Sequence, residues 1–145
     1  MLKLPEQIRG ALIEQAQKEA PAECCGLLAG VDDRVTEIYP ITNLPSDDPR
    51  VADLKVPEDR KYRYIMDPKG QLAAFKHMRA HQLTLLAIYH SHPHSPAYPS
   101  ATDVRLAVYP EVHYIIVSLM KEPEIRIFRI VEEQITEETL CLMSP

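Results

Sequence analysis

The sequence predicts a single-domain α/β fold, with a mixed β-sheet flanked by about three helices. The 145 residues suit one domain spanning positions 1–145, because a chain of this length can bury a full hydrophobic core. Segments with the spacing of amphipathic helices alternate with short apolar runs of strand length. One of those runs, residues 84–89, is apolar along nearly its whole length, which is typical of a central strand covered on both faces.

The overall composition argues against several classes of protein. Hydrophobic residues make up 46% and charged residues 26% of the chain, as in an ordinary soluble globular protein. The net charge of -5 offers no basic excess for a nucleic-acid partner. No run approaches the ~18 apolar residues of a membrane span, and the N-terminus lacks the features of a signal peptide. Three cysteines do not form an even-numbered disulfide framework, so we expect a cytoplasmic protein without a membrane partner.

The first third of the chain is expected to form a helix followed by two strands. The elements are, in order, a helix over 5–20, a strand over 24–30, a turn over 31–34 and a strand over 35–41. Pro5 suits the first helical position and Pro21 ends the helix. Cys24 and Cys25 are interpreted as core residues of the first strand.

A polar stretch over residues 42–60 interrupts this pattern. A loop of this length is often functional, and we interpret it as a flap near the substrate, with a plain surface excursion as the alternative. A brief strand over 62–66 is expected to follow it. Asp67 and Pro68 then supply an N-cap and a proline at the first helical position.

The helix that begins there is expected to run to about residue 82. Helical spacing assigns its inward side to Leu72, Phe75 and either Met78 or Ala74. His77 and His81 are therefore expected on the surface or at the core edge. Beyond the central strand we expect a helix over 100–109, a hairpin of strands over 113–120 and 125–131, and a tail from residue 132 that forms either a strand or a short helix.

Two histidines follow the central strand directly. His90 and His92 stand two residues apart, so both imidazoles point to one face of the strand. Asp103 lies in the first turn of the next expected helix, where Ser100 and Asp103 also resemble a capping box. A capping role for Asp103 and a role as a metal ligand can coexist. Two histidines and one aspartate would leave a tetrahedral zinc ion one open position, which is the design of a catalytic site.

A catalytic zinc site also needs groups that move protons and stabilise charge. Glu23 stands at the entrance of a strand, where it is either a solvated lead-in or an acid held over a pocket. A carboxylate beside the metal could transfer protons between water and the leaving group, which makes Glu23 the candidate. The hydroxyl of Ser100 could donate a hydrogen bond to an oxyanion.

These residues together resemble a known signature. Glu23 and the run His90-Ser-His92-Pro-x-x-x-Ala97-x-Pro99-Ser100-x-x-Asp103 are similar, without a gap, to the motif of the JAMM or MPN-plus metalloproteases. The similarity extends through Asn43 and through residues 64–68, so it covers most of the chain. The resemblance implies an MPN fold related to that of cytidine deaminases.

The resemblance also implies roles for individual residues. One zinc ion would be held by His90, His92 and Asp103. Glu23 would act as general acid and base, and Ser100 would steady the tetrahedral intermediate.

The implied substrate is a protein with a C-terminal glycine. Members of the family cut peptide or isopeptide bonds after the last glycine of ubiquitin or ubiquitin-like proteins. Small prokaryotic versions typically act on a ubiquitin-like sulfur carrier or small modifier that ends in Gly-Gly. The chain lacks an insertion after Pro110, so selectivity for one ubiquitin linkage is not expected. A homodimer is compatible with this assignment.

Three alternatives remain at this stage. A non-catalytic MPN-type module would bind a ubiquitin-like partner without cutting it. A zinc nucleobase deaminase would need a Pro-Cys-x-x-Cys segment, which the chain lacks. A structural metal site would need a fourth protein ligand, for which His94 is the available residue. Since His94 follows Pro93 and departs from strand alternation, it is left out of the expected ligand set.

Overall fold

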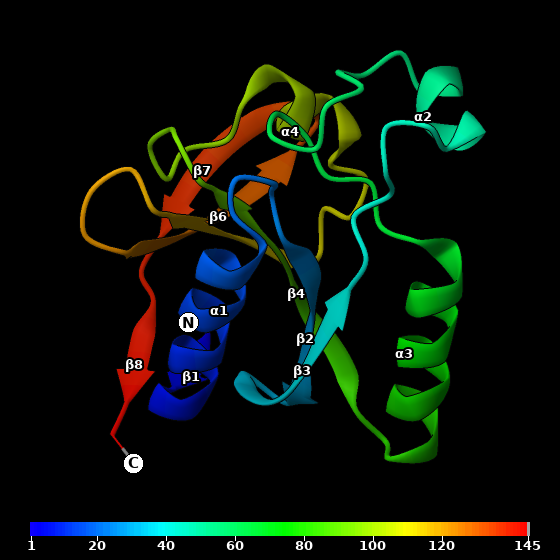
Figure 1. The fold of residues 1–145 in the computed structure, drawn as a ribbon. Helices are drawn as coiled ribbons and strands as arrows, with labels where there is room; N and C mark the ends of the chain where they lie inside the picture. The colour runs from blue at the N-terminus through cyan, green and yellow to red at the C-terminus, as the bar shows by residue number, and fades with distance from the viewer. Residues whose placement is uncertain (145) are drawn as a thin grey trace.

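The fold was obtained as a computed structural model that describes residues 1–144 (Figure 1). The described residues form a mixed α/β structure with one sheet, as the sequence predicts, and with four helices where about three were expected. The elements are, in chain order, β1 (Lys3–Pro5), α1 (Glu6–Glu19), β2 (Cys25–Val31), β3 (Arg34–Ile41), α2 (Pro49–Asp53), α3 (Pro68–Ala80), β4 (Thr84–His92), α4 (Ala101–Leu106), β5 (His113–Ser118), β6 (Glu124–Val131), β7 (Gln134–Glu138) and β8 (Cys141–Met143).

The strand order places β4 at the heart of the sheet. The order is β7-β6-β5-β4-β2-β3-β1-β8. Strand β4 runs antiparallel to β2 and parallel to β5, so the sheet is mixed and β4 is an interior strand, as expected. The register pairs Cys25 with His90. Glu23, two residues before Cys25, is thereby brought beside the C-terminal end of β4.

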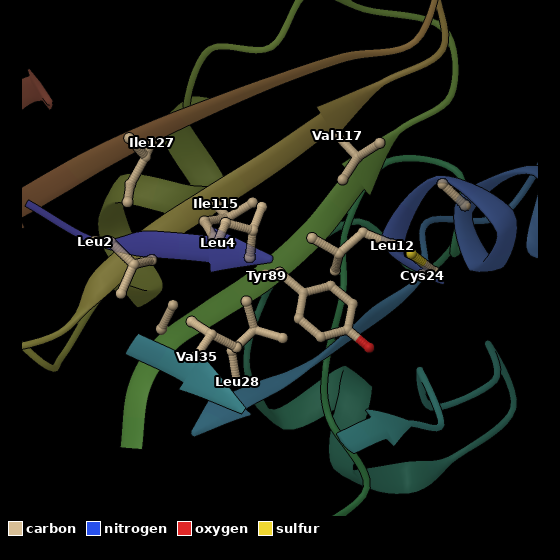
Figure 2. Close-up of a cluster of buried hydrophobic side chains, with 12 residues drawn as sticks. Leu2, Leu4, Leu12, Cys24, Leu28, Val35, Tyr89, Ile115, Val117 and Ile127 are labelled. Carbon is tan, nitrogen blue, oxygen red and sulfur yellow. The ribbon is translucent and has the colours of Figure 1, made fainter. Parts of the chain in front are cut away.

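The core lies on both faces of this sheet, because α1 and α3 flank the central strands from opposite sides (Figure 1). Leu12 and Ala16 of α1 pack on the face that carries Tyr89, and Figure 2 shows Leu12 and Tyr89 in this cluster. The other face carries Ile88 and belongs to the α3 cluster. Since neighbouring residues of a strand alternate between faces, His90 and His92 share the face of Ile88.

The inward side of α3 differs from the prediction. Leu72 and Phe75 are 56% and 38% exposed, whereas Ala74 and Met78 are buried. The assignment of Leu72 and Phe75 is therefore wrong. The reason is a close approach: a Cβ on Gly70 would lie 3.0 Å from the Cγ2 atom of Ile41. The helix thus turns the row of Gly70, Ala74 and Met78 toward the sheet, and Leu72 and Phe75 away from it.

The segment between β3 and α3 also differs from the prediction. Residues 62–66 do not form a strand, and their one ladder contact is a bridge between Met66 and Asn43. The polar stretch over 42–60 contains the short helix α2, which Asp48 caps by accepting a hydrogen bond from the Arg50 N–H. Side-chain and backbone hydrogen bonds together satisfy this segment: Asn43 accepts the Ile65 N–H, and the Ile65 carbonyl accepts the Leu44 N–H.

The two ends of the described chain meet in the sheet. Strand β1 pairs in parallel with β8, with Lys3 opposite Cys141. The tail therefore forms strands, β7 and β8, which resolves the open choice against a helix. Helix α4 ends at Leu106, earlier than the expected residue 109. Among residues 1–144, no helix is long and apolar enough to cross a membrane.

Candidate metal site

Four acidic and histidine side chains from three parts of the chain converge at the C-terminal end of β4. His90 and His92 belong to β4, Asp103 to the first turn of α4, and Glu23 to the connection between α1 and β2. All four are buried, with exposed fractions between 1% and 6%. One ligand atom of each lies within 4.8 Å of the others. The structure thus brings together the residues that the sequence nominated.

Three of the four form a tight triangle of ligand atoms. His90 Nε2 and His92 Nε2 are 3.1 Å apart, and Asp103 Oδ2 lies 3.0 Å from the first and 3.1 Å from the second. Ligand atoms around a tetrahedral zinc ion are separated by about 3.3 Å, given bond lengths of about 2.0 Å. A small expansion of the triangle would therefore admit the ion. Glu23 makes no hydrogen bond to any of the three within the described residues, which sets it apart from them.

The orientation of His92 is fixed by a hydrogen bond on its far side. Its Nδ1 atom lies 2.8 Å from the carbonyl oxygen of Pro96. Because a carbonyl can only accept, Nδ1 carries a proton, and in the neutral imidazole Nε2 presents its lone pair to the triangle. This pairing of a histidine with an outer carbonyl is typical of metal ligands.

His90 is held in a different way. Its ring stacks on Tyr64, with centroids 4.4 Å apart and an angle of 22° between the planes. Its Nδ1 atom is buried and has no hydrogen-bond partner within the described residues. Stacking and strand geometry, rather than a hydrogen bond on the far side, therefore orient its Nε2 atom.

Asp103 serves a helix cap and the triangle at once. Its Oδ2 atom accepts the Ser100 N–H at 2.9 Å, and the Ser100 hydroxyl accepts the Asp103 N–H at 3.1 Å. The capping box is therefore complete, and it coexists with the convergence on the two histidines. Because the Ser100 hydroxyl accepts from the backbone, its own proton is free to point outward.

The charges of the cluster depend on burial and on one another. Burial raises the pKa of Glu23 to about 9, with the negative charge of Asp103 adding to the shift and the positive charge of Arg63 opposing it. Burial also lowers the pKa of His90. For Asp103 burial opposes ionisation, but the two histidines outweigh it and hold the pKa below its usual range. A cation in the triangle would favour the ionised form of Glu23.

Other residues considered from the sequence lie outside the cluster. His94 is exposed and is absent from the converging group, so the described structure does not bring it forward as a fourth ligand. Cys24 and Cys25 are fully buried, as expected of core residues. His77 of α3 and His81, which follows its last residue, are exposed, as expected.

Sequence reasoning assigned no role to Tyr64 or Arg63, although both adjoin the cluster. Tyr64 stacks on a candidate ligand, and Arg63 is fully buried within reach of the charge on Glu23. No periodicity marks either residue, because both lie in an irregular segment whose contacts arise only in the folded chain. The similarity of residues 64–68 to the metalloprotease motif was the one available signal.

Comparison with curated proteins gives relatives along most of the chain. It is 34% identical over 143 residues to the CysO-cysteine peptidase of Mycobacterium tuberculosis, covering 95% of this chain and 88% of that protein. It is 33% identical over 123 residues to the desampylase of Haloferax volcanii, covering 81% and 80%. It is 39% identical over 114 residues to a probable TtuB-protein conjugate cleaving protease of Thermus thermophilus, covering 78% and 64%.

Solved structures share the fold. A solution structure of a Desulfitobacterium hafniense protein matches with a TM-score of 0.83 at 35% identity, covering 100% of this chain and 94% of that one. A JAB1/MPN domain protein of Archaeoglobus fulgidus matches with a TM-score of 0.60 at 17% identity, covering 99% and 97%, which supports the MPN fold alone. Residues 5–131 match the family described as prokaryotic homologs of the JAB domain. The chain therefore belongs to the prokaryotic JAB family.

Proposed function

We propose that the protein is a zinc metallopeptidase that cuts the peptide or isopeptide bond after the C-terminal glycine of a ubiquitin-like protein. The buried triangle of His90, His92 and Asp103 carries this proposal, together with the neighbouring Glu23, whose Oε1 atom has no hydrogen-bond partner within residues 1–144. The peptidase names of the curated relatives support the reaction class. The similarity to the JAMM signature supports a ubiquitin-like partner, either a sulfur carrier or a small modifier that ends in Gly-Gly.

The donor set suits one zinc ion. Two imidazole nitrogens and one carboxylate oxygen are ligands that zinc prefers, and three protein ligands leave a position open for reaction. His90 and His92 would bind through Nε2, and Asp103 through Oδ2. When bound, zinc supplies a Lewis acid that makes water nucleophilic near neutral pH.

The chain's own residues would then move the protons. The Oε1 atom of Glu23 is buried and has no hydrogen-bond partner within residues 1–144, so it is available to an attacking water. Glu23 would accept a proton from that water and return it to the leaving amine. The outward hydroxyl proton of Ser100 would stabilise the negative charge that develops on the attacked carbonyl oxygen.

A mostly apolar cavity adjoins the site and could receive an extended tail. It measures about 240 Å³, and its lining includes Tyr64, which stacks on His90, together with Ile88, Leu106, Val108 and Tyr109. A chain that ends in two glycines has no side chains to obstruct such a passage. This cavity supports a slim C-terminal segment, rather than a folded surface, as the part of the substrate that enters.

The decisive experiment incubates the zinc-loaded protein with ubiquitin-like carriers that bear C-terminal extensions or lysine-linked adducts. Intact mass then reports a product that ends in Gly-Gly, and the two substrate types separate peptide from isopeptide cleavage. Absence of product across the panel, together with tight carrier binding, would overturn the proposal in favour of a non-catalytic binding module.

The matched variant is Glu23→Gln, which removes the proton acceptor but keeps the side-chain shape. We expect it to retain one zinc ion and to lose at least about 100-fold in kcat. Glu19→Gln is the control, because it makes the same change four residues earlier, outside the converging group. Equal rates for Glu23→Gln and the parent protein would contradict the role of Glu23.

A further inference from the structure

We propose that Arg63 and Asn43 are positioning residues that hold the backbone of Glu23 in place. They do so by fastening the segment over residues 43–63 against the connection between α1 and β2. We call this pair the latch. The inference rests on the proposed function, because it gives the latch a purpose only if Glu23 transfers protons.

Arg63 is the first part of the latch. Its side chain is fully buried, and no carboxylate pairs with it among residues 1–144. Its guanidinium instead donates to four oxygen atoms: the carbonyls of Leu44 (2.7 Å), Pro57 (3.0 Å) and Glu58 (2.6 Å) and the Oδ1 atom of Asn43 (2.6 Å). A buried charge without a carboxylate partner is costly. The hydrogen bonds of the Arg63 guanidinium connect the start of the segment, at residues 43–44, to residues 57–58.

Asn43 is the second part, and it uses its full hydrogen-bonding capacity. Its Nδ2 atom donates to the carbonyl oxygens of Glu23 and Arg63, at 2.9 Å each. Its Oδ1 atom accepts from the Arg63 guanidinium and from the Ile65 N–H. Asn43 is 2% exposed, so water cannot readily replace these bonds. The amide therefore connects Arg63 directly to the Glu23 backbone.

The backbone of Glu23 depends on this segment on both sides. Its N–H donates to the Arg60 carbonyl at 2.8 Å, and its carbonyl accepts from Asn43. Strand β2 begins only at Cys25, and the neighbouring Cys24 is already hydrogen-bonded to β4, but no strand pairing holds Glu23 itself. The latch therefore fixes the Glu23 carbonyl, and with it the direction from which the carboxylate reaches the triangle.

A lysine could not take the place of Arg63. Lysine offers three donors from one point, whereas the planar guanidinium reaches acceptors that lie in different directions. A purely electrostatic influence of Arg63 on Glu23 would survive the change to lysine, but the latch would not. Arg63→Lys therefore separates the two explanations.

The first test measures kinetics on the zinc-loaded enzyme with a cleavable carrier. Arg63→Ala and Arg63→Lys should both lower kcat at least about tenfold, with KM changed by less than about twofold and zinc content unchanged. Arg60→Ala is the matched control: it removes a charge from the same segment, and no hydrogen bond from its side chain is found within residues 1–144. Restoration of kcat by lysine would overturn the latch.

Asn43→Asp keeps the test decisive if the arginine variants fail to fold. It preserves the shape of the side chain and its bond with Arg63, replaces the NH2 donor to the carbonyls of Glu23 and Arg63 with an oxygen atom, and adds a negative charge that pairs with the guanidinium. We expect the same loss of kcat at constant zinc content. A folded Asn43→Asp variant with the parent kcat would refute the proposal.

The second test needs no substrate. Exchange of the Glu23 amide proton, followed by NMR on the zinc-loaded protein, should accelerate at least about tenfold in Arg63→Lys and stay unchanged in Arg60→Ala. Unchanged exchange in Arg63→Lys would overturn the latch. If the parent protein cleaves no carrier, the proposed function fails, while this measurement still decides whether the latch exists.

Discussion

Ser100 illustrates how one residue can serve both structure and chemistry. Its hydroxyl accepts the Asp103 N–H at the start of α4, and the proton of that hydroxyl is left free. Ser100→Ala should therefore lower stability by about 1 kcal/mol, through loss of the cap. It should also lower kcat about 100-fold, through loss of the donor to the developing oxyanion. Thermal unfolding and steady-state kinetics on the zinc-loaded protein measure the two effects separately.

The control for that prediction is a cap that lies outside the site. Asp67 caps α3 by accepting the Lys69 N–H at 2.9 Å, so Asp67→Ala should cost a similar amount of stability with no change in kcat. Ser100→Thr retains the hydroxyl and should retain most of the activity. A Ser100→Ala variant that is destabilised but fully active would limit Ser100 to its capping role.

At the scale of residues, the sequence predicts the members of the cluster well, because strand and helix geometry fix the directions in which their side chains point. His90 and His92 share a face by alternation, and the capping pattern places Asp103 in a first helical turn. The burial of Arg63 beside the cluster could not be predicted in this way. An arginine in a polar stretch is usually solvent-exposed, and its burial follows from carbonyls that come together only when the segment folds.

At the scale of elements, Gly26 lets β2 lie against its neighbours. A Cβ at this position would collide with the Tyr89 hydroxyl and with the backbone oxygen of Tyr39. Gly26→Ala should therefore destabilise the protein by about 2 kcal/mol, which lowers Tm by roughly 4–8 °C. The Tyr89 hydroxyl would also be displaced from Gln15, whose Oε1 atom accepts its hydrogen bond at 2.5 Å. Thermal denaturation of the zinc-loaded protein measures the loss.

A glycine-to-alanine substitution at another position should have the opposite effect on stability. Gly10 lies inside α1, and a Cβ there meets nothing within 4 Å. Gly10→Ala should raise stability by about 0.5–1 kcal/mol, because alanine is the better helix former. Equal Tm values for the two alanine variants would show that the close approach at Gly26 is relieved at no cost.

The elements that the sequence predicts correctly are those with a local signal of their own, such as the helical spacing of α1 and the apolar run of β4. The short strands β1 and β8 carry no such signal, since each has three residues and depends on pairing with distant parts of the chain: β1 with β3 and β8, and β8 with β1. The inward side of α3 was misassigned because its contact with β3 is set by Gly70, a residue without a side chain. Tertiary packing, rather than local pattern, decides these cases.

At the scale of the molecule, the candidate site brings together one strand of the sheet and two segments that lie outside the sheet. The ligand atoms come from β4 and α4, and the neighbouring carboxylate comes from the connection that leads into β2. Helix α4 has only six residues, so its own hydrogen bonds hold it weakly. A zinc ion bound by Asp103 would fasten α4 to the central strand.

Removal of the metal should therefore weaken the whole fold. Zinc that is present at about 1,000 times its Kd stabilises the folded state by about 4 kcal/mol, so chelation should lower Tm by on the order of 10 °C, and added zinc should restore it. His92→Ala should abolish this zinc-dependent shift. His94→Ala is the matched control, because this histidine lies outside the converging group. A zinc-dependent shift that survives in His92→Ala but vanishes in His94→Ala would place the ion on a different set of ligands.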